Sequence, residues 1–257
     1  TKNNHFGKNT DLLKIFNTST GAIEKVVCLV TEDMYSIANL ANELVSGDYH
    51  IEYSDIENIS LYYIGFAMGA YKFDKYKSKP KANNISLYLP KDYKNILAEV
   101  EATYLVRDMI TTPAEDMSPE DISSVVKQLA KEFDGSIEEL IGEELRESGY
   151  MGIYTVGKGS HREPRLVKLS WGNEAHPKVS IVGKGVSFDT GGLDVKPSSG
   201  MMLMHKDMGG AANAIGLAYV IMKHKLPVNI TLVISTVENA TDAKSYRPSD
   251  IIMMKNG

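Results

Sequence analysis

Apolar residues recur every three or four positions over several stretches of the chain, and this spacing predicts α-helices. In residues 95–110, for example, Ile96 and Val100 would share one buried face. Ser118 can cap a helix that begins at Pro119, because its hydroxyl can accept a hydrogen bond from the first turn. The predicted helices cover residues 34–44, 56–73, 95–110, 137–145 and 208–223, together with the segment that follows Ser118.

Other stretches alternate between apolar and polar residues or form short β-branched runs, as strands do. The predicted strands cover residues 26–30, 85–89, 165–171, 178–182 and 228–237, and the fourth runs into a glycine-rich turn. Strands that alternate with helices indicate an α/β fold class, with helices on both faces of a sheet. The pattern also predicts a boundary near residue 90, between a small N-terminal α/β domain at 1–90 and a second α/β domain at 91–257.

The net charge and the single cysteine narrow the class of protein. The formal charge is −5 at pH 7, which argues against nucleic acid as a partner, because phosphate binding needs a basic face. No apolar stretch approaches the roughly 20 residues that span a bilayer, so we expect no membrane partner. Cys28 lies in an apolar run and is expected to be a buried thiol. Low cysteine usage fits a reducing, cytoplasmic location.

Polar side chains of the kinds that catalyse reactions or bind metal ions are concentrated in residues 182–212, around predicted strand ends, turns and a helix start. Four of them stand out: Lys184, Asp189, Lys196 and Asp207. Ligands of α/β proteins bind at the carboxyl ends of strands, and two carboxylates are compatible with a divalent metal ion. Ordinary structural roles are equally open at this point: the lysines can be solvated, Asp189 can be a turn residue and Asp207 can cap a helix.

The same segment resembles the leucyl aminopeptidase family, whose pattern opens V-G-K-G-[IV]-[ST]-F-D-[ST]-G-G and continues to a D-M-G-G-A-A segment. This chain reads VGKGVSFDTGGLDVKP and later KDMGGAA. Asp189 comes five residues after Lys184, Lys196 comes seven residues after Asp189, and Asp207 comes eleven residues after Lys196. Residues 107–119 and 164–172 also resemble family segments, and the resemblance extends from about residue 62 to residue 257. It implies that 91–257 is a mixed-sheet α/β metallo-exopeptidase catalytic domain that is incomplete at its C-terminal end.

The resemblance also implies a role for each position. Lys184, Asp189 and Asp207 match metal-ligating positions of the family. Lys196 matches the lysine that polarises the scissile carbonyl and stabilises the tetrahedral oxyanion. Met204 matches a wall of the apolar pocket for the first side chain of the substrate, although an ordinary core methionine is an equally good interpretation.

The chemistry that the family performs accounts for these residue types. Two metal ions can clamp the free α-amine and the adjacent carbonyl oxygen of a peptide, and they lower the pKa of a bound water to near neutrality. Carboxylates are hard ligands that can bridge two cations, which suits Asp189. A lysine ligand such as Lys184 must be uncharged, which requires burial and a nearby cation. Lys196 must stay charged to meet the developing oxyanion.

Further expectations follow from the family. Two divalent ions are implied, Zn²⁺ or Mn²⁺ and possibly Mg²⁺, with bicarbonate as a general base. The implied partners are short peptide substrates and, by resemblance, a hexamer of this chain. The family also has an N-T-D-A-E-G-R segment with two more metal ligands and the bicarbonate arginine, and this sequence contains no such segment. We therefore expect the 257-residue chain by itself to bind metals poorly and to be inactive, and we expect the parent protein to be longer.

Two other functions compete with this interpretation. Residues 152–158 nearly spell a phosphate-binding P-loop, but Gly159 takes the position where the magnesium site needs Ser or Thr. If the chain is an aminopeptidase, we expect the same residues to form a strand and a glycine turn. The second competitor is a catalytically inert fragment or a non-enzymatic family member with a structural or binding role.

Overall fold

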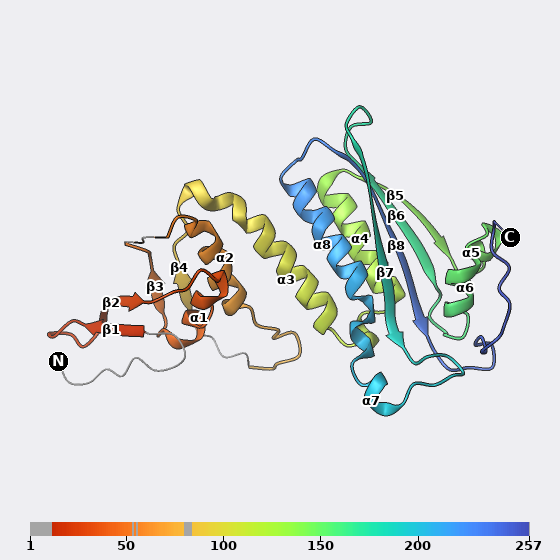
Figure 1. The fold of residues 1–257 in the computed structure, drawn as a ribbon, viewed down its shortest axis with the longest axis horizontal. Coiled ribbons are helices and arrows are strands. Elements are labelled where there is room, and N and C mark those ends of the chain that lie inside the picture. Colours follow the sequence, from red (N-terminus) through yellow and green to blue (C-terminus); the bar gives the residue numbers. More distant parts are fainter. Residues whose placement is uncertain (1–11, 53, 55, 80–83, 257) are drawn as a thin grey trace. The chain divides into compact units, whose positions relative to one another are not determined.

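The computed structural model describes residues 12–52, 54, 56–79 and 84–256. The chain divides into two compact units, Thr1–Val100 and Glu101–Gly257, and the division falls within helix α3 (Leu97–Thr111). Each unit has its own hydrophobic core. The α/β fold class predicted from the sequence is confirmed (Figure 1). No helix of the described residues is both long and apolar enough to cross a membrane.

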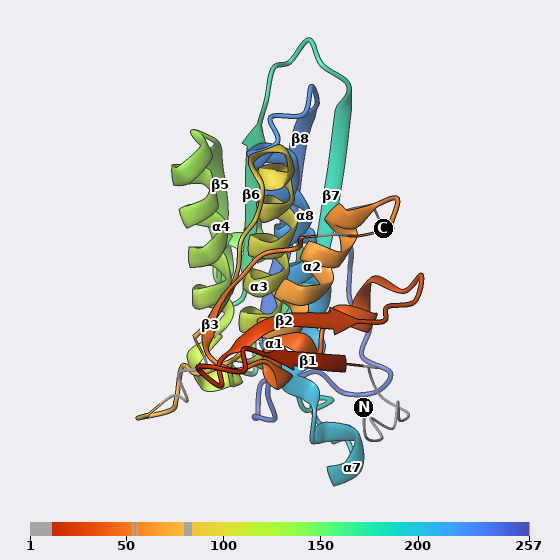
Figure 2. The same ribbon diagram turned by 90° about the vertical axis from the view of Figure 1, so that its left-hand side faces the viewer.

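The first unit combines two small sheets with short helices. One sheet is an antiparallel hairpin and the other a parallel pair, and the two hairpin strands lie side by side in Figure 2. Its elements are β1 (Leu12–Phe16), β2 (Ile23–Cys28), η1 (Met34–Ile37), α1 (Leu40–Glu43), β3 (Gly47–Tyr49), α2 (Ile59–Ala70), β4 (Ile85–Leu87) and η2 (Lys91–Ile96). Cys28 is half-buried at the end of β2, and not fully buried as predicted.

The single helix predicted for residues 34–44 is wrong, because this segment forms the 3-10 turn η1 and the short helix α1. Helix α2 lies directly against its backbone. A Cβ atom added to Gly65 or Gly69 would be 1.9 Å from a carbonyl oxygen of the segment. Next to α2 the backbone takes the tighter 3-10 form, in which the Ala38 N–H donates to the Tyr35 carbonyl (2.9 Å).

The second unit is built around a mixed four-stranded sheet of order β5-β6-β8-β7. Strand β8 is central: β6 pairs with it antiparallel and β7 pairs with it parallel. The arrowheads of β7 and β8 therefore point to the same edge of the sheet in Figure 1. The elements after α3 are η3 (Ala114–Asp116), α4 (Pro119–Phe133), β5 (Ser136–Ile141), α5 (Glu143–Glu147), α6 (Met151–Gly157), β6 (Arg165–Trp171), β7 (Lys178–Asp189), α7 (Ser198–Met201), η4 (Met204–Met208), α8 (Gly209–Lys223) and β8 (Asn229–Asn239).

Helices α4 and α8 cover one face of this sheet and form the main core with it. Ile215 on α8 and Leu232 and Ile234 on β8 are fully buried there. The predicted cap of α4 is confirmed: the Ser118 hydroxyl accepts from the Asp121 N–H, and the Asp121 carboxylate accepts from the Ser118 N–H (2.9 Å).

The helix predicted for residues 137–145 is wrong, since these residues form strand β5 and the start of α5. The segment is rich in Glu and Leu, which favour helices locally. Pairing with β6 overrides this preference, because every residue from Ser136 to Ile141 pairs with a residue of β6 and Ile137 packs against the main core. The exposed ion pair between Lys168 and Glu138 (2.8 Å) adds little. Glu139 is half-buried on the same strand and forms an ion pair with Lys127 (2.6 Å).

Candidate active site

Strand β7 carries the first candidate residue and is longer than predicted. The sequence predicted a strand at 178–182 and a glycine-rich turn after it, but the strand continues to Asp189. Gly183 and Gly185 are there because α8 packs closely on this strand: a Cβ atom on Gly183 would be 2.7 Å from the Cα atom of Ala211. Lys184, between the two glycines, points away from this contact and is exposed. The glycines therefore permit helix packing and do not form a turn.

Asp189 lies at a β-bulge at the end of β7. Val186 pairs with Val237 and Asp189 pairs with Asn239, so three steps along β7 match two steps along β8. Bulges of this kind redirect a side chain and are common beside active sites. The Asp189 carboxylate faces the end of β8, where its Oδ1 accepts from the Asn239 side-chain amide (2.7 Å). The bulge thus places a carboxylate at the sheet edge.

The Asp189 carboxylate accepts further hydrogen bonds from the loop that follows it. Its Oδ1 accepts from the Gly191 N–H (3.0 Å), and its Oδ2 accepts from the Lys196 ammonium. Partial burial raises the pKa of this carboxyl, but the donors from Lys196, Gly191 and Asn239 outweigh burial and hold the pKa of Asp189 below its usual range. The carboxylate is therefore ionised at neutral pH, as a cation ligand must be.

The loop of residues 190–196 brings Lys196 back to Asp189. Gly191 and Gly192 have φ values of 94° and 80°, in the region that favours glycine, and the chain reverses there. The Lys196 N–H donates to the Thr190 carbonyl (2.9 Å), which closes the loop. The Lys196 side chain is 29% exposed, so its charge meets both the carboxylate and solvent.

Lys184 and Asp207 form a second ion pair. Asp207 lies in the 3-10 turn η4 ahead of α8, and helix α8 has no side-chain cap hydrogen bond. The helix-capping interpretation of Asp207 is therefore wrong, because its carboxylate is used by Lys184 instead. The side chain of Lys184 is 61% exposed, and that of Asp207 is 21% exposed. An uncharged Lys184 was expected to be buried, and in the structure its side chain is exposed.

Met204 opens the turn η4 and is half-buried. It is three positions before Asp207, so one short turn carries both the predicted pocket residue and a predicted metal ligand. Large apolar side chains of the neighbouring chain segments are exposed, including Val195 (52%) and Met202 (74%). The surroundings of the candidate residues are therefore partly apolar.

The donor set fits a divalent cation by its chemistry. Asp189 and Asp207 present carboxylate oxygens, a ligand type that suits a divalent cation, and each is paired with a lysine ammonium. Among the described residues, however, no three His, Cys, Asp or Glu side chains form a group that could hold a metal ion. Two carboxylates and one amine would not by themselves complete the coordination of two ions.

Comparison with known proteins identifies the family. Residues 104–257, more than half of the chain, match the cytosol aminopeptidase family catalytic domain. The chain belongs to the cytosol aminopeptidase family. Residues 2–90 match the N-terminal domain of M17 aminopeptidases. The resemblance stated from the motifs around Lys184 and Asp207 is thereby confirmed.

Individual similar proteins show how much of each chain is aligned. A probable cytosol aminopeptidase of Rhodococcus opacus (strain B4) is 36% identical in an alignment of 211 positions, and the match covers 75% of this chain and 42% of that protein. The cytosol aminopeptidase structure from Coxiella burnetii is 39% identical with a TM-score of 0.89, covering 95% of this chain and 54% of that one. The bottromycin maturation enzyme BotP in complex with Mn is 28% identical with a TM-score of 0.78, covering 87% of this chain and 51% of that one. The chain thus spans about half the length of its relatives, or less.

The phosphate-binding alternative is wrong. Residues 151–157 form helix α6 and not a loop between a strand and a helix, and the strand and glycine turn expected there for an aminopeptidase is also wrong. A Cβ atom on Gly159 would be 2.2 Å from the Ser245 hydroxyl, so this glycine permits close packing of two chain segments. No open cradle of backbone N–H groups is present in these residues.

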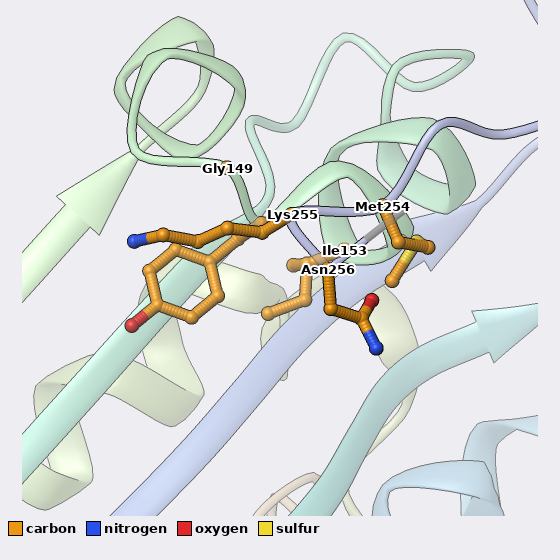
Figure 3. A pocket seen from close by; sticks show the side chains of 7 residues that line it. Gly149, Ile153, Met254, Lys255 and Asn256 are labelled. Carbon is orange, nitrogen blue, oxygen red and sulfur yellow. The ribbon is translucent and has the colours of Figure 1, made fainter.

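A hollow of about 360 Å³ lies beside α6, apart from the candidate residues. Its lining is Gly149, Tyr150, Gly152, Ile153, Met254, Lys255 and Asn256. Figure 3 shows that Met254, Lys255 and Asn256 lie next to Ile153 and that their side chains point in different directions. None of the five residues singled out from the sequence lines it. Its only charged lining side chain is Lys255, which gives it no catalytic constellation.

The sequence-based argument missed two residues of the site, Asn239 and Thr190. The Thr190 hydroxyl donates to the Asn239 carbonyl (2.8 Å) and thereby ties the loop to the end of β8. One signal was available: Asn239 follows a β-branched run, and polar residues at the carboxyl ends of adjacent parallel strands meet at one edge. The parallel pairing of β7 and β8 was needed to use that signal, and the sequence did not supply it.

Proposed function

We propose that the protein containing this chain is a metal-dependent aminopeptidase that releases N-terminal amino acids from short peptides. One observation carries the proposal: two aspartate–lysine pairs lie on β7, its following loop and η4, within the residues that match the catalytic domain of the cytosol aminopeptidase family. Carboxylate oxygens are ligands that suit Mn²⁺ and Mg²⁺, and two carboxylates can contribute to one metal site.

In this proposal Asp189 and Asp207 hold divalent cation, with Lys184 as a further ligand once its proton has left. Bound divalent ions would supply Lewis-acid polarisation and a water that is easily deprotonated. Asp189 suits its role because its hydrogen bonds keep it ionised. Lys184 must release Asp207 and lose a proton before it can bind a metal, so metal binding and proton release are coupled.

Lys196 has a different task, because its charge must act on the substrate. The Lys196 ammonium is now paired with Asp189 Oδ2, and it would lose this partner if Asp189 held a metal ion. A released ammonium at the rim of the site can donate to the carbonyl oxygen of the scissile bond and stabilise the oxyanion. Met204, half-buried at the start of η4, would contact the first side chain of the substrate.

Several finer features belong to the same proposal. Two ions are proposed, with Mn²⁺ as the first to test because a related structure was solved with Mn; Zn²⁺ and Mg²⁺ are the alternatives. Carboxylate ligands suit Mn²⁺ and Mg²⁺ in particular. We further propose a cytoplasmic hexamer and a boundary between the N-terminal and catalytic domains near residue 90. A bicarbonate base would have to bind to residues outside this chain's motifs.

The requirement for a free amine tests this function. The full-length protein with Mn²⁺ is expected to hydrolyse leucine p-nitroanilide but not N-acetyl-leucine p-nitroanilide, because an acetylated nitrogen cannot bind a cation as an amine does. The release of p-nitroaniline is measured for both substrates under the same conditions. Equal hydrolysis of the two compounds, or hydrolysis of neither, would contradict an aminopeptidase.

A further inference from the structure

The side chain of Asn239 is buried at the point where β8 meets the candidate metal site. It is 4% exposed, and its Nδ2 donates to Asp189 Oδ1 at 2.7 Å. The opposite assignment of the amide would bring its oxygen against the carboxylate, so charge fixes which atom faces Asp189. Its Oδ1 has no hydrogen-bond partner among the described residues and is also buried.

A buried acceptor without a partner is unfavourable, and an apolar side chain of similar size would avoid it. The presence of an amide at position 239 is therefore explained by the hydrogen bond from its nitrogen to Asp189. The backbone adds two more connections, because the Asn239 carbonyl accepts from both the N–H (3.0 Å) and the hydroxyl (2.8 Å) of Thr190. Asn239 thus makes three hydrogen bonds to residues 189–190, which directly follow the bulge.

The two oxygens of Asp189 have partners of different kinds. Oδ1 accepts from two neutral donors, the Asn239 amide and the Gly191 N–H, whereas Oδ2 accepts from the charged Lys196. A neutral donor fixes the direction of a carboxylate without cancelling its charge. Oδ1 is therefore the anchored oxygen, and Oδ2 is the oxygen whose cationic partner can be exchanged.

We infer that Asn239 is a positioning residue for the metal-ligating carboxylate of Asp189. The inference rests on the proposed function, since it takes Asp189 to be a metal ligand. Asn239 acts through Asp189: it holds the carboxylate so that Oδ2 faces the cation with its charge intact. Hydrogen bonds of this kind orient metal ligands in proteins, and their loss typically weakens metal affinity by about 10- to 100-fold.

The test is Mn²⁺ binding by isothermal titration calorimetry to the metal-free full-length protein. Asn239→Leu has nearly the shape of the amide but no donor, and we expect it to weaken Mn²⁺ binding by about 10- to 100-fold. Thr236→Val is the matched control: Thr236 is fully buried on the same strand, and its hydroxyl has no partner among the described residues. Its Mn²⁺ affinity should equal that of the wild type.

Other outcomes separate the inference from the function on which it rests. If Asp189→Ala binds Mn²⁺ as tightly as the wild type, the proposed metal site fails. If Asp189→Ala loses affinity and Asn239→Leu does not, only the positioning role is overturned. Circular dichroism reports folding, and Asn239→Ala, which also lacks a donor, replaces Asn239→Leu if the larger side chain prevents folding. Misfolding of both variants would overturn the inference in favour of a purely structural residue.

Discussion

Lys196→Ala is expected to lower kcat for leucine p-nitroanilide by about 10²- to 10³-fold in the full-length protein, with little change in KM. This is the typical loss when one donor to a developing oxyanion is removed. An unchanged KM would follow because the interaction is made in the transition state and not with the bound substrate. Steady-state kinetics at saturating Mn²⁺ measures both constants.

Two comparisons make the result for Lys196 specific. Lys178→Ala removes an exposed lysine at the start of β7 and should leave both constants unchanged. The metal content of Lys196→Ala should equal that of the wild type, because Lys196 is the partner of Asp189 and not a ligand of the metal. A rise in KM without a fall in kcat, or loss of the metal, would contradict the assigned role.

Asp207→Asn is expected to lower kcat/KM by about a thousandfold and to weaken Mn²⁺ binding. The variant keeps the shape of the side chain but removes the charge that now holds Lys184. The magnitude follows because a bound metal contributes several kcal/mol to the transition state, and each 1.36 kcal/mol is a factor of ten in rate. Calorimetric Mn²⁺ titration and kinetics at two Mn²⁺ concentrations are the measurements.

The matched control for Asp207 is Asp194→Asn, an exposed aspartate in the loop that also contains Lys196. It should retain wild-type metal affinity and activity, which shows that the loss of one negative charge near the site is not sufficient. If Asp207→Asn keeps both properties as well, Asp207 is an ion-pair partner of Lys184 and nothing more.

Local sequence signals predicted those parts of the fold in which the local preference and the tertiary contacts agree. The capped helix α4 and the alternating strand β6 are examples, since each has one apolar face that the core buries. Residues 136–141 were mispredicted because their helix-favouring composition yields to pairing with β6. Residues 183–189 were mispredicted because a glycine in the sequence can indicate either a turn or a close contact between segments. Only the packing of α8 against β7 distinguishes the two.

The sequence predicted which residues belong to the candidate site, and the structure shows which lysine is paired with which aspartate. The motif gave Lys184, Asp189, Lys196 and Asp207, but it did not give the pairing of each lysine with an aspartate. Asn239 was missed because its role arises from the bulge that brings it opposite Asp189. A register shift of one residue leaves no mark on a hydrophobic pattern that is read along one strand at a time.

The position of bound Mn²⁺ tests the central claim most directly. An anomalous difference map from crystals of the full-length protein grown with Mn²⁺ should show a peak bonded to carboxylate oxygens of Asp189 and Asp207, with the Lys196 ammonium no longer on Asp189. A map with Mn²⁺ bound elsewhere, and with both aspartate–lysine pairs intact, would contradict the proposal that these residues form the metal site of an aminopeptidase.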